Sequence, residues 1–136
     1  MSLPARIGAP LLVGAAAVGT CAAVWLGDPT TPGGLLPVCP TKALLGIDCP
    51  GCGSLRTVYS LLHGDFASAL RFNAVAVGAL ILLFVAYVTW TYGRVVGRRV
   101  VGWQHHRWAA PATMIVVTVW FVARNLPFPP FTALRV

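Results

Sequence analysis

The sequence has few charged side chains and hardly any acidic ones. Of its 136 residues, Asp and Glu together account for 3, charged residues of both signs make up 10%, and apolar residues make up 57%. A small soluble domain exposes much of its surface to water and usually carries about 25% charged residues. The composition therefore excludes an ordinary soluble domain, and the scarcity of acids argues against a paired-carboxylate catalytic site.

The sequence also lacks the common catalytic motifs. It contains no phosphate-binding loop, no nucleophile elbow and no metalloprotease helix. Its long apolar runs are not interrupted by the ionisable residues that ion and proton carriers use inside the bilayer. We therefore expect no catalytic residues, no bound cofactor and no transport activity, and the sequence favours a non-enzymatic role.

What the sequence does have is three uncharged runs separated by arginines. Because about 20 helical residues cross the hydrocarbon layer, we predict transmembrane helices at 8–27, 72–93 and 108–126. The third run is short, so we expect Arg107 and Arg124 at its ends to extend their charged groups outward toward water. The pattern predicts an all-α membrane protein with three transmembrane helices, in which residues 1–136 form a single membrane domain.

The distribution of arginines predicts the orientation. The connection 94–107 holds Arg94, Arg98, Arg99 and Arg107 and no acid, whereas the loop 28–71 has balanced charges. The positive-inside rule then places the N-terminus and 94–107 in the cytoplasm, and the loop 28–71 and the tail 127–136 outside. Because the basic residues flank apolar runs, they do not indicate a nucleic-acid partner. We expect the proline-rich tail to lie extended along the outer interface.

Small residues recur at four-residue spacing in two of the predicted spans. Ala15 and Gly19 form one such pair, and Ala74 and Gly78 form the other. This spacing allows two helices to approach closely. It also arises by chance in a membrane sequence rich in Ala and Gly, and both interpretations stay open.

The predicted outer loop contains three of the four cysteines and a short amphipathic segment. Residues 54–63 are predicted to form a helix with Ser54 as N-cap and Gly64 as its end. Asp65 is expected to cap a further turn, and Lys42 to be solvated. Arg56 is expected to pair with Asp48 or Asp65, or to bind lipid phosphate. The apolar stripe of the helix consists of Leu55, Val58, Tyr59 and Leu62.

Three kinds of chemistry fit the cysteines. The first is a structural disulfide among Cys39, Cys49 and Cys52, whose pairing the sequence leaves open. The second is thiol–disulfide exchange by Cys49 and Cys52, in which the following helix would lower the pKa of Cys52. The third is zinc bound by the three cysteines together with His63.

The cysteine motif resembles a family of small bacterial integral membrane proteins that has no assigned function. The resemblance rests on a C-P…C-P-G-C-G-x-x-R signature formed by Cys39, Pro40 and residues 49–56, followed by Asp65 and Asn73. It implies a bacterial plasma-membrane location, and we expect Gly53, Arg56, Asp65 and Asn73 to shape the loop. The basic, Ala- and Val-rich sequence also resembles those of actinobacteria, and small three-helix proteins of this kind are similar to an accessory subunit of the cytochrome bcc–aa3 respiratory supercomplex.

The preferred hypothesis is therefore a non-catalytic accessory subunit or assembly factor. Its expected partners are the lipid bilayer and a larger integral membrane complex, for which the resemblance suggests the respiratory oxidase assembly. One alternative is an extracytoplasmic thiol–disulfide redox factor that uses Cys49 and Cys52. The other is a module that binds lipid or peptide at the outer leaflet.

Overall fold

The chain is all-helical over the residues that the structure describes. A computed structural model describes residues 3–31, 39–98 and 100–135 and contains no strand within these ranges. Two helices, over Arg6–Gly27 and Phe66–Val96, are long and apolar enough to cross a membrane, and a third apolar helix is shorter. The α-helices are α1 (Leu3–Gly27), α2 (Pro40–Leu45), α3 (Ser54–Leu62), α4 (Phe66–Val96) and α5 (Ala109–Asn125), and the 3-10 turns are η1 (Trp103–His105) and η2 (Phe131–Leu134).

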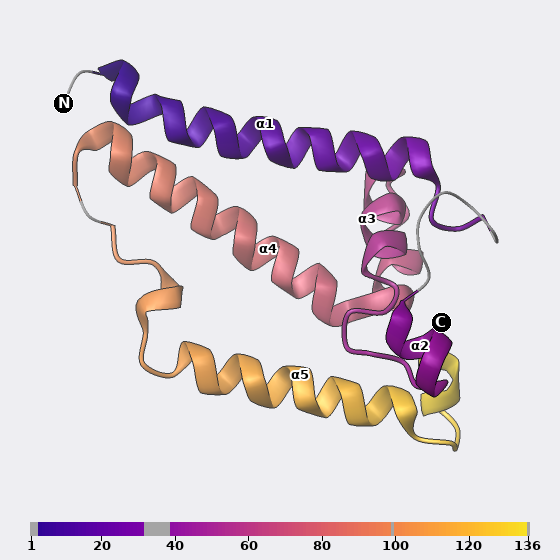
Figure 1. The fold of residues 1–136 in the computed structure, drawn as a ribbon. Helices are drawn as coiled ribbons and strands as arrows, with labels where there is room; N and C mark the ends of the chain where they lie inside the picture. Colours follow the sequence, from indigo (N-terminus) through magenta and orange to yellow (C-terminus); the bar gives the residue numbers. More distant parts are fainter. Residues whose placement is uncertain (1–2, 32–38, 99, 136) are drawn as a thin grey trace.

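The two ends of the molecule differ in what they carry (Figure 1). The short helices α2 and α3 and the C-terminal turn η2 lie together at one end, which we call the cysteine end. The N-terminus and the connection between α4 and α5 lie at the opposite end, which we call the basic end. The cysteines of the predicted outer loop and the arginines of 94–107 are thus separated by the length of the long helices.

Polar contacts around a proline join α1 to α4 near the basic end. Pro10 has no N–H, so the carbonyl of Arg6 lacks its usual helical donor. The Nε of Arg94 donates to that carbonyl at 3.3 Å, and the hydroxyl of Tyr87 donates to the carbonyl of Pro10 at 3.0 Å. At Gly14 a Cβ would lie 2.9 Å from the Tyr87 hydroxyl, so the absence of a side chain there lets the tyrosine reach α1.

Helix α4 contains a kink at Asn73 that explains where the predicted second span begins. The backbone of Asn73 is extended, with φ −162° and ψ 93°, so the helix consists of two parts. Asp65 caps the first part by accepting from the N–H of Ser68 at 3.0 Å, as expected. Asn73 caps the second part by accepting from the N–H of Ala76 at 2.9 Å. The predicted start at residue 72 therefore corresponds to the kink.

The most deeply buried residues lie at the cysteine end, and several of them are polar. The largest fully buried side chains are Arg124, Asn73 and Thr57. Helix α3 turns its polar face inward, where the Thr57 hydroxyl donates to the carbonyl of Ala69 at 3.2 Å. Its apolar stripe is the more exposed face, and Leu55 is 40% exposed. The amphipathic pattern thus located α3 correctly, but the face of α3 that packs against the rest of the protein is the polar one.

Two local predictions need correction, and one short helix was not predicted. The N-cap of α3 is Gly53, which adopts φ +82°, and Ser54 is the first helical residue. Helix α2 was not predicted; it begins with Pro40 at its first position and ends at Gly46 with φ +66°. The tail is not extended, because η2 folds back on α5 and Arg124 Nε donates to the Leu134 carbonyl at 3.0 Å.

Candidate cysteine site

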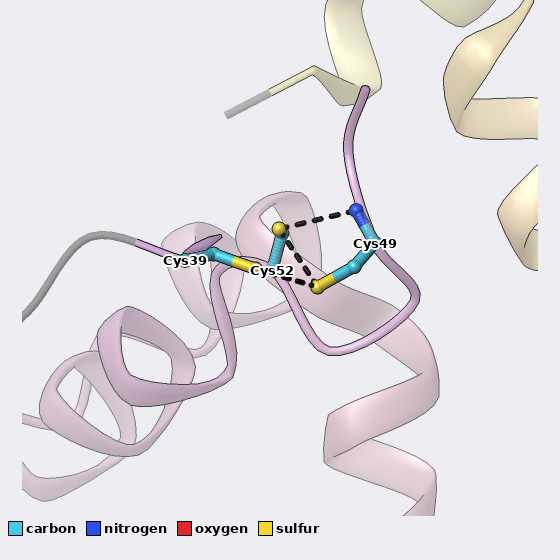
Figure 2. A group of neighbouring side chains, drawn as sticks. All are labelled: Cys39, Cys49 and Cys52. Atoms are coloured by element: carbon cyan, nitrogen blue, oxygen red, sulfur yellow. Dashed lines mark hydrogen bonds between the residues drawn. The ribbon is translucent and has the colours of Figure 1, made fainter. Parts of the chain in front are cut away.

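The fold brings Cys39, Cys49 and Cys52 together (Figure 2). The Sγ of Cys49 lies 3.2 Å from that of Cys39 and 2.9 Å from that of Cys52, and all three sulfur atoms lie within 4.8 Å of one another. All three residues are free thiols in this structure. The site therefore combines a cysteine at the start of α2 with two from the loop before α3.

The sequence Pro50-Gly51 explains why Cys49 and Cys52 meet. Proline at the second position and glycine at the third are typical of a tight turn. The N–H of Cys52 donates to the carbonyl of Cys49 at 3.0 Å and closes the turn. The N–H of Cys49 in turn donates to the Cys52 sulfur at 3.2 Å.

Asn73 and Arg124 hold the carbonyls of this turn from two different helices. The side-chain amide of Asn73 donates to the carbonyls of Pro50 at 2.9 Å and of Cys52 at 3.2 Å. The Nη1 of Arg124 donates to the same Cys52 carbonyl at 2.6 Å. One buried carbonyl thus accepts from both α4 and α5, which fixes the position of the cysteine turn.

Asn125 fixes the residue before the turn. Its Oδ1 accepts from the N–H of Asp48 at 3.1 Å, and its Nδ2 donates to the Asp48 carbonyl at 2.9 Å. The side-chain amide of Asn125 thus bonds both the N–H and the C=O of Asp48, as the backbone of a neighbouring β-strand does. The end of α5 therefore supports the loop at two positions, Asp48 and Cys52.

The sequence reasoning missed both α5 residues. Arg124 was predicted to extend outward, but it is fully buried because its guanidinium donates to the carbonyls of Cys52 and Leu134. One signal pointed to it: Arg124 is a basic residue on the predicted outer side, against the positive-inside rule. A charge in the wrong place for topology is a candidate for a contact inside the protein.

The other charged residues of the loop also have definite partners. The Nζ of Lys42, predicted to be solvated, lies 3.1 Å from the buried carboxylate of Asp48, an ionic contact without hydrogen-bond alignment. Arg56 pairs with neither acid. Its Nε donates to the carbonyl of Pro29 at 3.1 Å, and its guanidinium lies 6.0 Å from the ring centroid of Phe72.

His63 does not join the three sulfur atoms. Its ring stacks on Trp25 of α1 with a centroid distance of 4.1 Å, and its Nδ1 lies 2.8 Å from the carbonyl of Tyr59. The histidine ends α3 and links it to α1. The structure therefore brings together three of the four residues predicted as zinc ligands.

Cys39 and Cys52 differ in the pKa of their thiols, and the shift at Cys52 is opposite to the one expected from the sequence. Hydrogen bonding from Cys49, with help from the backbone N–H of Lys42, lowers the pKa of Cys39 from 9.0 to about 6. Burial raises the pKa of Cys52 from 9.0 to about 12. Burial thus outweighs the effect of the following helix, and Cys39 is the thiolate at neutral pH.

Comparison with known proteins adds a family but no activity. Residues 39–88 match a family described as a protein of unknown function (DUF2752). This family is uncharacterised. The matched segment contains the three cysteines and Asn73, and it ends within α4, before Arg124 and Asn125. No curated protein and no solved structure matches the chain.

Replacement of Asn73 should destabilise the fold strongly. Asn73→Ala leaves the carbonyl of Pro50 without its donor and removes the cap of the second part of α4. Each lost buried hydrogen bond costs roughly 1–3 kcal/mol, so we expect a loss of about 2–4 kcal/mol in the free energy of unfolding. Unfolding of the protein in mixed detergent micelles, followed by circular dichroism, measures this loss.

Two further variants serve as a comparison and a control for this measurement. Asn73→Asp keeps the capping oxygen but loses the donors to the turn, so it should also be destabilised. Thr20→Ala removes only an exposed hydroxyl that donates to the Ala16 carbonyl, and should change stability by about 0.5 kcal/mol or less. An Asn73→Ala protein as stable as Thr20→Ala would contradict the role given to Asn73.

Alkylation should follow the order of thiol acidity. In the reduced protein at neutral pH, iodoacetamide should modify Cys39 first and Cys52 last, since the thiolate is the nucleophile. The rate at Cys39 should fall as the pH is lowered through about 6, because protonation removes its thiolate. Timed alkylation followed by peptide mass spectrometry measures each rate. Equal rates at Cys39 and Cys52 would show that the described environments do not control reactivity.

Proposed function

We propose that the protein is a non-catalytic, three-helix membrane protein that associates with a larger membrane complex. Under this proposal its cysteine end lies outside the bacterial plasma membrane, and its basic end lies in the cytoplasm. The actinobacterial respiratory supercomplex is the first candidate partner, because small three-helix proteins of this basic, Ala- and Val-rich kind resemble one of its accessory subunits. The sparse packing among the long helices is the observation that carries the proposal.

The long helices bury little of their apolar surface within the chain. Only 11% of the apolar window of α1 and 6% of that of α4 is buried. Figure 1 shows α4 and α5 diverging toward the basic end. Surfaces of this kind require lipid or another protein to cover them, because the helices contact one another mainly at the cysteine end and through a few polar contacts between α1 and α4.

Two glycines with free space around them indicate that another protein covers part of the exposed helix surface. A Cβ at Gly19 or Gly78 would meet no atom within 4 Å, so the small-residue pairs of α1 and α4 are not used for contact at these glycines within the chain. Small residues at four-residue spacing let a second helix approach closely. We assign the faces around Gly19 and Gly78 to contact with the partner complex.

Bulky residues at these glycines should disrupt the complex without disturbing the isolated chain. Because the space is open, Gly19→Leu and Gly78→Leu should fold normally yet lose most of the partner that co-purifies with the wild type. Purification in mild detergent followed by quantitative mass spectrometry measures the partner. The assay requires that a partner co-purifies with the wild-type protein at a fixed stoichiometry. A wild-type protein that purifies without such a partner would contradict the proposal.

Gly14 provides the matched control. Gly14→Leu should weaken the contact between α1 and Tyr87 and lower stability, because even a Cβ there would lie 2.9 Å from the tyrosine hydroxyl. If Gly19→Leu and Gly78→Leu retain the partner in full, these faces contact lipid and the assignment is wrong. If they lose stability as Gly14→Leu does, the loss of partner reflects folding.

The proposed orientation can be tested separately. A reporter that is active only outside the cytoplasm, inserted after Gly64, should be active, because α3 ends there at the proposed outer surface. The same reporter inserted at Gln104 in the basic connection should be inactive. The reverse pattern would overturn the orientation and leave the fold unaffected.

Thiol–disulfide exchange is the second candidate function. The short distances between the sulfur atoms favour it, whereas their triangular arrangement disfavours direct attack of Cys39 on Cys49. A thiolate at Cys39 lies 3.2 Å from Cys49, whose sulfur also contacts Cys52. A Cys49–Cys52 disulfide would then have a nucleophile beside it. A pair that stays oxidised at every imposed redox potential in alkylation trapping would exclude this candidate. Binding of lipid or peptide at the outer leaflet has no comparable contact in its favour.

A further inference from the structure

The three sulfur atoms form a triangle rather than a line. All lie within 4.8 Å of one another, which is well below the sum of the two Cys49 contacts of 3.2 Å and 2.9 Å. When a thiolate displaces a sulfur atom from a disulfide, the three sulfur atoms lie nearly in a line. In that arrangement the distance between the sulfur atoms of Cys39 and Cys52 would equal the sum of the two Cys49 distances. The triangle is therefore a poor arrangement for exchange in which Cys39 attacks Cys49.

A triangle of thiolates is a good arrangement for a metal ion. With Zn–S bonds of about 2.3 Å and tetrahedral angles, the sulfur atoms of a zinc site lie about 3.8 Å apart. The sulfur atoms here are within about 1 Å of that spacing. Soft thiolate ligands favour zinc and copper(I) over the hard cations that bind oxygen.

Arg124 supplies the second observation. Its side chain is fully buried beside the cysteine turn, and its Nη2 group has no acceptor among the described residues. Its Nη1 donates to the Cys52 carbonyl at 2.6 Å, and the next residue, Asn125, bonds the backbone of Asp48, so the acidic groups on this side of the loop are Asp48, Cys49 and Cys52. A buried charge without a partner is costly, so this guanidinium requires negative charge nearby.

Neutral thiols at Cys49 and Cys52, or a disulfide between them, would not supply that charge within the turn that Arg124 contacts. Asp48 lies 3.1 Å from Lys42, which already neutralises it. A disulfide between Cys49 and Cys52 would leave both sulfur atoms of this turn uncharged. Three thiolates around one Zn²⁺ ion carry a single net negative charge, which the single positive charge of Arg124 balances.

We propose that Cys39, Cys49 and Cys52 together bind one Zn²⁺ ion, with Arg124 as the buried counter-charge. The site has three protein ligands, and His63 is not one of them. Zinc with three protein ligands takes a further ligand from solvent or from a bound molecule. The inference does not depend on the identity of the partner complex, because every group it uses belongs to this chain.

Metal analysis of the full-length protein in mild detergent tests the proposal. Purified with Zn²⁺ and then freed of loosely bound metal, the wild type should retain about one zinc per chain. Cys39→Ser, Cys49→Ser and Cys52→Ser should each bind zinc at least tenfold more weakly. Cys21→Ser and His63→Ala are the matched controls and should retain it. Zinc retained by the three ligand variants, or lost in His63→Ala, would overturn the assignment.

A measurement on the wild type alone covers variants that fail to fold. Zinc should protect Cys39, Cys49 and Cys52 from alkylation, and its removal by a chelator should expose them, as counted by peptide mass spectrometry. Equal alkylation with and without Zn²⁺ would overturn the proposal. So would a Cys49–Cys52 disulfide that persists after reduction and purification with Zn²⁺, or a site that retains copper(I) but not zinc.

The counter-charge is tested at Arg124. Arg124→Gln can still donate to the turn but has no charge, and it should weaken zinc binding by about 10–100-fold, as for other groups next to a metal ligand. Arg124→Lys keeps the charge and should recover part of the loss. Equal zinc affinity in Arg124→Gln and the wild type would show that the buried charge serves another purpose.

Discussion

The carbonyl group of Cys52 is the point on which the cysteine end depends. It accepts from Asn73 of α4 and from Arg124 of α5, so it joins two helices that are otherwise sparsely packed. Irregular backbone next to an apolar environment must satisfy its own polar groups, because little water is available to do so. The chain meets this requirement with long polar side chains from helix ends and kinks rather than with a sheet or a larger core.

This constraint explains why so many buried residues at the cysteine end are polar. Thr57, Asn73 and Arg124 are fully buried, and each donates to a backbone carbonyl. A short loop with no apolar core of its own gains its rigidity from such bonds, each of which is costly to lose. The apolar residues, by contrast, lie mainly on the outer faces of α1, α4 and α5. The distribution is the reverse of that in a soluble domain, as the composition led us to expect.

The sequence allowed prediction of the helices, whose positions follow from periodicity and charge. It did not allow prediction of the contacts between residues that lie far apart in the chain. Apolar run length located α1, α4 and α5, and the amphipathic stripe located α3. The cysteine spacing brought attention to the correct loop. The buried face of α3 could not be read from its pattern, because the choice depends on Thr57 and Ala69 meeting across 12 residues of chain. Arg124 and Asn125 were missed because their partners lie 72 and 77 residues away.

The match to the uncharacterised family has the same limit. It covers residues 39–88 and so includes the sulfur atoms and Asn73, but it stops before the α5 residues that complete the support of the turn. The signature thus marks the reactive groups, whereas their electrostatic surroundings come from a part of the chain outside it. A protein with the same signature but no equivalent of Arg124 would lack this donor to the Cys52 carbonyl.

The distance between Cys52 and Arg124 has a consequence for biogenesis. The arginine leaves the ribosome 72 residues after the cysteine. Because chains emerge from the N-terminus onward, the cysteine turn is synthesised well before the arginine that completes its support. The Cys52 carbonyl can accept from Arg124 only after α5 has been made, so the site forms in its full geometry only once the C-terminal helix is present.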